Sequence, residues 1–191
     1  IILSCAFAAH GVTQLWFGEE NAAVTQGYYA DYSRLTPKQE QILRQYDDFF
    51  VRYEELFFDD SLRDVSMTHF GWDNTEYSCS LPASVSGEAE KIWLILREKP
   101  GIKLISAINL IGDCSDLWAE GHSDCAVQDD LTFDVQFFGT IRKVLAAAPE
   151  KAGGDLQPLE YTIEQGERSP MIHITLPELG RFAFILIETE E

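Results

Sequence analysis

The sequence predicts a chain in two parts, an α/β segment followed by an all-β antiparallel sandwich with Greek-key-like connections. Apolar residues between positions 36 and 57 recur at three- and four-residue intervals, which is typical of an amphipathic helix. After position 90 the pattern changes to short apolar runs separated by glycine and proline, which is typical of strands joined by turns. We therefore expect an α/β domain over residues 1–60, a linker over 61–87 and a β domain over 88–191.

Composition and charge limit the classes of partner. The 191 residues are 46% hydrophobic and 12% aromatic, enough for one sizeable core or two small ones. A formal net charge of −18 repels phosphate backbones and anionic lipids, so we expect neither a nucleic-acid nor a membrane partner. Four cysteines are too sparse for a small disulfide scaffold, and they leave the redox compartment open.

The first segment is apolar and alanine-rich. Residues Ile1–His10 predict a core helix whose first part lies upstream, and Gly11 suits the position that follows a helix. The β-branched and aromatic residues of Val12–Phe17 predict a buried strand. A long loop through Tyr28 and Tyr29 follows, and loops after such strands often carry sites in α/β folds.

The second helix has a clear start signal. Thr36 suits the N-cap, Pro37 the first helical position and Gln39 the third, so the first backbone amides have partners. One broad apolar stripe then follows, and a stripe this aromatic indicates core packing rather than a cofactor site. Its members are Ile42, Leu43, Tyr46, Phe49, Phe50, Tyr53, Leu56 and Phe57.

Short strands dominate the second half. Lys91–Glu98 and Ile102–Ile111 are separated by the turn residues Lys99, Pro100 and Gly101, which predicts a hairpin. Turn-rich linkers separate the later strand candidates, and together the strands favour an antiparallel sandwich of about a hundred residues. These candidates are Leu131–Phe138, Ile141–Ala147, Leu159–Gln165, Met171–Leu176 and Arg181–Glu188.

One acidic loop concentrates potential metal ligands. It has neither the C-x-x-C nor the H-x₃-H spacing of a zinc site, nor the alternating ligands and glycine of an EF-hand. We therefore interpret it as a solvated loop and expect no metal and no cofactor. A disulfide between Cys114 and Cys125 stays open. The residues considered are Asp113, Cys114, Asp116, His122, Asp124 and Cys125.

Motifs for nucleophilic catalysis are absent from the sequence, which has no Gly-x-Ser-x-Gly elbow and no Walker glycine loop. His173 alternates with apolar residues, so we expect it to face outward from a strand and give it no role. Neighbouring carboxylates are common, but adjacent side chains diverge on both helices and strands. Only Glu19 and Glu20, just past the first predicted strand, lie where an α/β site is expected, as one wall of a pocket.

The order of these features resembles glycoside hydrolase family 66, which comprises dextranases and cycloisomaltooligosaccharide glucanotransferases. The first part is similar to the end of that family's catalytic (β/α)₈ barrel and the second to its C-terminal antiparallel domain. The resemblance covers nearly the whole chain in the same order. The segments that carry it are Leu15–Glu19, Val24–Tyr29, Tyr46–Leu56, Lys91–Gly101, Ile108–Gly112, Asp116–Trp118, Leu145–Pro149 and Ile172–Pro177.

The resemblance implies the C-terminal part of a retaining hydrolase or transglycosylase acting on α-1,6-glucan, such as dextran or isomaltooligosaccharides, at a secreted or cell-surface location. The family's aspartate nucleophile and glutamate acid/base lie upstream of the matched segments, so we assign no catalytic residue. The rest of the barrel is then a partner of this chain. By analogy Glu19, Glu20, Tyr28 and Tyr29 line sugar subsites, although Gly27 replaces an acidic residue that is frequent in the family.

Three alternatives remain at this stage. Hydrolysis and cyclisation are both compatible with the family. The β domain alone is instead a non-catalytic carbohydrate-binding or structural module, with Trp118 as either a core anchor or a sugar platform. The last alternative is a self-sufficient small enzyme that uses Glu19 and Glu20.

Overall fold

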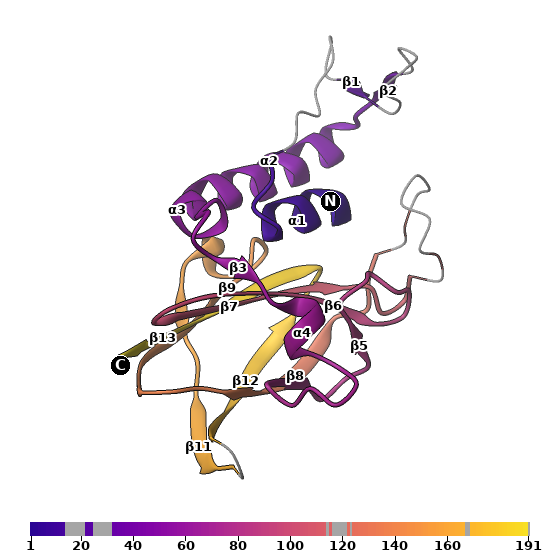
Figure 1. Ribbon diagram of the computed structural model, residues 1–191. Coiled ribbons are helices and arrows are strands. Elements are labelled where there is room, and N and C mark those ends of the chain that lie inside the picture. The colour runs from indigo at the N-terminus through magenta and orange to yellow at the C-terminus, as the bar shows by residue number, and fades with distance from the viewer. Residues whose placement is uncertain are drawn as a thin grey trace. The chain divides into compact units, whose positions relative to one another are not determined.

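The computed structural model describes residues 1–13, 22–24, 32–113, 115, 122, 124–166 and 169–190 (Figure 1). The chain divides into two compact units. The first lies within Ile1–Asp59, and the second comprises Asp60–Asp116 and His122–Glu191. Among the described residues, none of the helices has the length and apolar character needed to cross a membrane.

The first unit contains helices α1 (Ile2–Ala9), α2 (Pro37–Arg52) and α3 (Glu54–Phe57). Strands β1 (Ala22–Val24) and β2 (Tyr32–Arg34) pair antiparallel, so a short ribbon interrupts the long loop that we expected. Gly11 follows α1 with a positive φ of 76°, as its predicted position requires. Of the predicted strand Val12–Phe17, residues 12 and 13 are not in a strand and 14–17 lie outside the described residues.

Helix α2 begins with the predicted capping box. The Thr36 hydroxyl accepts a hydrogen bond from the Gln39 amide, and the Gln39 side chain accepts one from the Thr36 amide. Aromatic side chains of α2 and α3 then contact one another edge to face, with ring centroids 5.1 Å apart for Phe49 and Tyr53 and 5.4 Å apart for Phe50 and Phe57. The predicted stripe is therefore a packing surface, with Phe49, Phe50 and Phe57 buried.

The second unit is built from two β-sheets, which Figure 1 shows as two layers. The larger sheet has the order β10 (Gln157–Pro158), β9 (Thr140–Ala147), β13 (Phe182–Glu190), β7 (Ile102–Asn109), β6 (Ile92–Lys99) and β3 (Arg63–Asp64), with β5 (Ala83–Ser84) also on β6. The smaller sheet has the order β11 (Tyr161–Gln165), β12 (Pro170–Leu179), β8 (Gln128–Gln136) and β4 (Tyr77–Cys79). Helix α4 (Ser66–His69) and a 3₁₀ turn at Ala152–Gly154 complete the unit.

One apolar core joins the two sheets. Strands β8 and β12 of the smaller sheet alternate in burial, and their buried side chains pack against one face of the larger sheet. The opposite face of the larger sheet is also apolar and buried, at Ile95, Leu104, Ile108, Phe182 and Phe184. The core between the sheets includes Leu94, Leu96, Ile105, Phe133, Val135, Ile172, Ile174, Ala183 and Ile185.

The predicted antiparallel sandwich is confirmed by this pairing. Strands β6 and β7 form the expected hairpin, with Lys99 opposite Ile102 and Gly101 at a positive φ of 76° in the turn. The order is no simple meander, because β13, the last strand, lies between β7 and β9. Residues 61–87, which we expected to be a linker, contribute α4, β3, β4 and β5 to this unit. The functional domain boundaries stay a prediction.

Candidate functional site

The predicted sugar-binding residues Glu19, Glu20, Tyr28 and Tyr29 lie outside the described residues. Their role therefore stays a prediction. The same holds for Trp118 and for the pairing of Cys114, whereas Cys125 carries a free thiol. Burial raises the pKa of the Cys125 thiol, so this group is not activated as a nucleophile.

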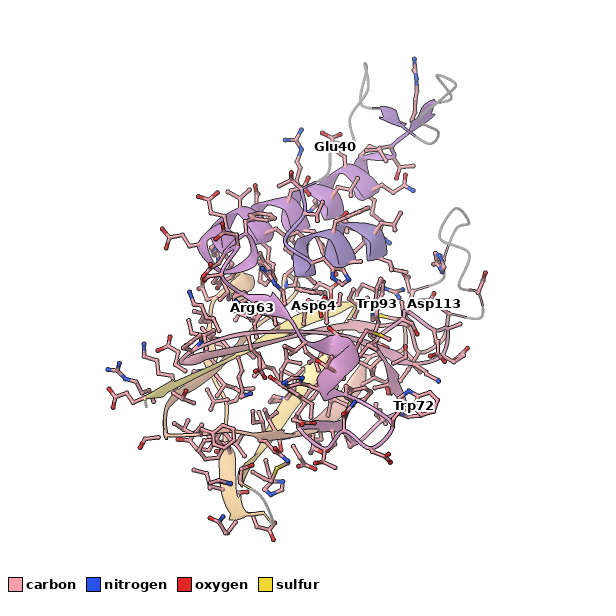
Figure 2. The ribbon with its side chains drawn as sticks, viewed as in Figure 1. Glu40, Arg63, Asp64, Trp72, Trp93 and Asp113 are labelled. Carbon is pink, nitrogen blue, oxygen red and sulfur yellow. The ribbon has the colours of Figure 1, made fainter. Side chains whose placement is uncertain are left out.

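The acidic loop after β7 differs from our expectation at its base. Asp113 is not solvated: its side chain is 1% exposed and pairs with Arg181, with Oδ2 and Nη1 2.5 Å apart. The same Arg181 nitrogen donates to the Asn109 carbonyl at 2.7 Å, and His122 Nδ1 lies 3.6 Å from Asp113 Oδ1. Figure 2 places Asp113 where this loop leaves the larger sheet. Asp113 is thus a structural anchor that ties the loop to β13.

No metal centre is formed by the part of the chain that the structure describes, since no three His, Cys, Asp or Glu side chains there are grouped to hold an ion. The ion pair explains why Asp113 is a poor metal ligand, because its carboxylate is already paired with the Arg181 guanidinium. No local pattern in the sequence indicates this pair, because its residues are 68 positions apart in the chain.

A polar row crosses the outer face of the smaller sheet. The strand register aligns Thr162 of β11 with His173 of β12, His173 with Asp134 of β8, and Asp134 with Ser78 of β4. Ser78 Oγ donates to Asp134 Oδ2 at 2.9 Å, and His173 Nδ1 lies 2.5 Å from Asp134 Oδ1. On its other side, His173 Nε2 lies 3.3 Å from Glu164 Oε2. His173 faces outward as expected, but it bridges two carboxylates.

The surrounding charges favour the protonated imidazole. The hydrogen bond to Asp134 is the main cause that raises the pKa of His173, and the nearby Glu164 carboxylate adds to it. The imidazole of His173 therefore lies between the Asp134 and Glu164 carboxylates. This geometry fixes polar groups on a sheet face, and it does not resemble the facing acid pair that glycoside hydrolysis requires.

A shallow groove of 530 Å³ lies on this sheet and includes Thr162 and His173 of the polar row. It combines one aromatic ring, hydroxyl groups, an imidazole and a carboxylate, which are the groups that hydrogen-bond and pack against neutral polar ligands. Its open shape suits binding better than chemistry, which needs water excluded. The residues that line it are Leu159, Glu160, Tyr161, Thr162, His173 and Thr175.

Sequence reasoning missed most of this surface. Only His173 was recognised as an outward strand residue, because its neighbours in β12 are apolar. Its partners Asp134 and Glu164, and Ser78 which donates to Asp134, come from three other strands, so the sheet register brings them together. Alternation within a strand predicts which side chains face outward, but no local pattern predicts which residues of two strands lie opposite one another.

The fold and this surface define an all-β sandwich domain with an open polar face, preceded by a helical unit. The sequence model of glycosyl hydrolase family 66 matches residues 1–186. The chain therefore belongs to glycosyl hydrolase family 66.

Two relatives agree with this assignment. The curated cycloisomaltooligosaccharide glucanotransferase of Niallia circulans is 26% identical over 184 residues, which are 95% of this chain and 18% of that protein. The crystal structure of a Paenibacillus cycloisomaltooligosaccharide glucanotransferase complexed with cycloisomaltoheptaose aligns with a TM-score of 0.83 at 21% identity. It covers 97% of this chain and 26% of the solved one, so the two share a fold. The present chain thus spans under a third of either relative.

Proposed function

We propose that this chain is the C-terminal portion of a retaining glycoside hydrolase or transglycosylase acting on α-1,6-glucan, and that the catalytic Asp and Glu lie elsewhere in the longer enzyme. The observation that carries the proposal is the family match over residues 1–186 in a chain that spans 18% of its curated relative. That relative is a glucanotransferase, and the solved neighbour holds a cyclic isomaltooligosaccharide. Dextran and isomaltooligosaccharides are therefore the proposed substrates.

Within this proposal the two parts of the chain have different tasks. Residues 1–60 supply the end of the catalytic barrel, and Glu19, Glu20, Tyr28 and Tyr29 line its sugar subsites. Flat aromatic faces stack on the C–H surfaces of glucose rings, and carboxylates accept hydrogen bonds from sugar hydroxyls. Residues 88–191 form an accessory β domain. The carboxylates Asp134 and Glu164 support a non-catalytic role there, because His173 lies between them.

The experiment measures products released from dextran and isomaltooligosaccharides by the 191-residue chain and by the longer family 66 enzyme that contains it. Chromatography of the products at long incubation times gives the readout. We expect turnover only from the longer enzyme, since the chain alone lacks the reacting acids. Turnover by the isolated chain that disappears in Glu19→Gln would overturn the proposal in favour of a self-sufficient small enzyme.

A further inference from the structure

A fully exposed tryptophan lies on the loop between α4 and β4. Trp72 exposes 101% of its reference surface, and Figure 2 shows its side chain extending away from the ribbon. Tryptophan is among the most deeply packed residue types on average, because water solvates its large ring poorly. A ring that buries none of its surface contributes nothing to the core, so the loop presents it to something outside the described residues.

The backbone at this ring is strained. Trp72 has a positive φ of 58°, a region that bulky side chains rarely adopt. The strain is held by the surrounding pairing, since Gly71 bridges Asn74 and the Asn74 amide donates to the Gly71 carbonyl at 3.0 Å. Backbone strain that the surrounding hydrogen bonds maintain is typical of functional positions. The loop therefore displays the indole in a fixed orientation.

The loop is also fastened to the smaller sheet. Phe70 bridges Tyr77 in parallel, Gln136 Nε2 donates to Thr75 Oγ1 at 3.2 Å, and the Gln136 amide donates to the Glu76 carbonyl at 2.8 Å. A ring mounted this way loses little conformational entropy when a ligand contacts it. These bonds make the loop a preorganised platform.

The chemistry around the ring selects a neutral, hydroxyl-bearing ligand. Asp73 is exposed and Asn74 half-buried beside the indole, and both offer hydrogen-bonding groups that suit sugar hydroxyls. A protein-interface core is depleted in charged residues around its aromatic anchors, whereas Asp73 and Glu76 flank this one. The net charge of −18 disfavours anionic ligands in addition.

We infer that Trp72 is an auxiliary contact for α-glucan on the second unit, where the indole stacks on a glucose ring, Asp73 accepts hydrogen bonds from its hydroxyls and Asn74 accepts and donates them. This inference rests on the proposed function for the nature of the sugar. The contact would hold a long substrate or product against the β domain while the reacting bond lies elsewhere.

The test is a titration of the 191-residue chain and its variants with a linear isomaltooligosaccharide, followed by calorimetry and by the indole N–H resonances of the tryptophans. We expect Trp72→Ala to bind about tenfold more weakly, the loss that corresponds to an aromatic contact of about 1.4 kcal/mol. Phe138→Ala is the matched control, because Phe138 is 75% exposed on a different loop. This control should bind as the unaltered chain does.

A second variant distinguishes a role of Trp72 in sugar binding from a role in stability. Trp72→Gly relieves the strained φ and should leave the thermal midpoint unchanged or higher, while it weakens sugar binding as Trp72→Ala does. Binding by Trp72→Ala equal to that of the unaltered chain, or no binding by any of them, overturns the inference and leaves the α-1,6-glucan assignment intact. Preference for a β-linked oligosaccharide of the same length would instead contradict the proposed function.

Discussion

Tyr77 links the two sheets of the sandwich through one carboxylate. Its hydroxyl, on β4, donates to Glu98 at the end of β6, and the Lys103 ammonium on β7 pairs with the same carboxylate. The ammonium also lies 5.2 Å from the centroid of the Tyr77 ring. Burial is the main cause that raises the pKa of Tyr77 well above its ordinary value, and the Glu98 charge adds to it.

We predict that Tyr77→Phe destabilises the fold by about 1.5–3 kcal/mol, the range for a hydrogen bond to a charged group. The unaltered chain should also lose stability as the pH rises above about 10, because the folded state holds the Tyr77 proton more tightly than the unfolded state does. Urea unfolding at several pH values measures both effects. Tyr161→Phe, at an exposed tyrosine, serves as control, and an equal loss in both variants would contradict the prediction.

His173 gives the smaller sheet a dependence on pH near neutrality. Its pKa is raised by the hydrogen bond to Asp134 first and by the Glu164 charge in addition, so the folded state favours the imidazolium. The contribution to stability is complete below the unfolded pKa of about 6.5 and disappears as the pH rises through the folded value.

We predict that the thermal midpoint falls between mildly acidic and mildly alkaline buffer, and that His173→Gln flattens this slope. His69→Gln, on α4, should keep the slope of the unaltered chain. Calorimetric scans across this pH range provide the measurement. A slope that survives in His173→Gln would show that another group carries it.

At the scale of single elements, the strongest local signals gave the most reliable predictions. The Thr36, Pro37 and Gln39 triplet predicted the start of α2 correctly because a capping box is made entirely by neighbours in sequence. The hairpin of β6 and β7 was equally local. The ribbon of β1 and β2 was missed, since strands of three residues carry too few side chains to show alternation.

The cap itself is testable. Thr36→Ala removes the side chain that accepts from the Gln39 amide, and we expect a loss of about 1 kcal/mol in the stability of the first unit. Gln41→Ala, at an exposed position inside α2, should be neutral or slightly stabilising because alanine has the higher helix propensity. Far-ultraviolet circular dichroism during denaturation compares the two. A larger loss at Gln41 than at Thr36 would be the contrary result.

Two phenylalanines close together in the sequence differ sharply in burial. Phe133 of β8 is 1% exposed between the sheets, while Phe138 beyond the end of that strand is 75% exposed. We predict that Phe133→Ala costs about 3–5 kcal/mol, by lost transfer energy and a cavity, whereas Phe138→Ala stays within about 0.5 kcal/mol. Equilibrium denaturation of both variants checks this. A loss for Phe133→Ala as small as that for Phe138→Ala would contradict the placement of Phe133 between the sheets.

At the scale of the whole molecule, the sequence predicted the architecture of the β domain but not its surfaces, and the end of a (β/α)₈ barrel in the first part stays a prediction. Alternation and turn residues identify seven of the strands of the β domain, and they cannot reveal that β13 returns to lie between β7 and β9. The ion pair of Asp113 with Arg181 depends on that long-range pairing, and the row around His173 depends on the pairing of β12 with β8 and of β8 with β4 in the smaller sheet. The family resemblance depends on short segments in a fixed order along the chain, and such segments are visible in the sequence alone.

Under the proposed function, the reaction takes place on residues beyond this chain. The larger sheet has two buried apolar faces, and the smaller sheet has an outer face of paired charges, which gives the β domain a structural and binding character. In the proposed function the chain works as part of a larger enzyme, so its own carboxylates should bind sugar without forming a covalent intermediate.

The most direct measurement is active-site labelling of the longer enzyme with a mechanism-based inactivator built on an α-1,6-linked glucoside. A retaining enzyme forms a covalent bond between its nucleophile and the sugar, so peptide mapping by mass spectrometry identifies the labelled carboxylate. We predict that the label is found on an aspartate outside residues 1–191 and that every peptide of this chain remains unmodified. A label on Glu19, Glu20 or any other carboxylate of this chain would contradict the account.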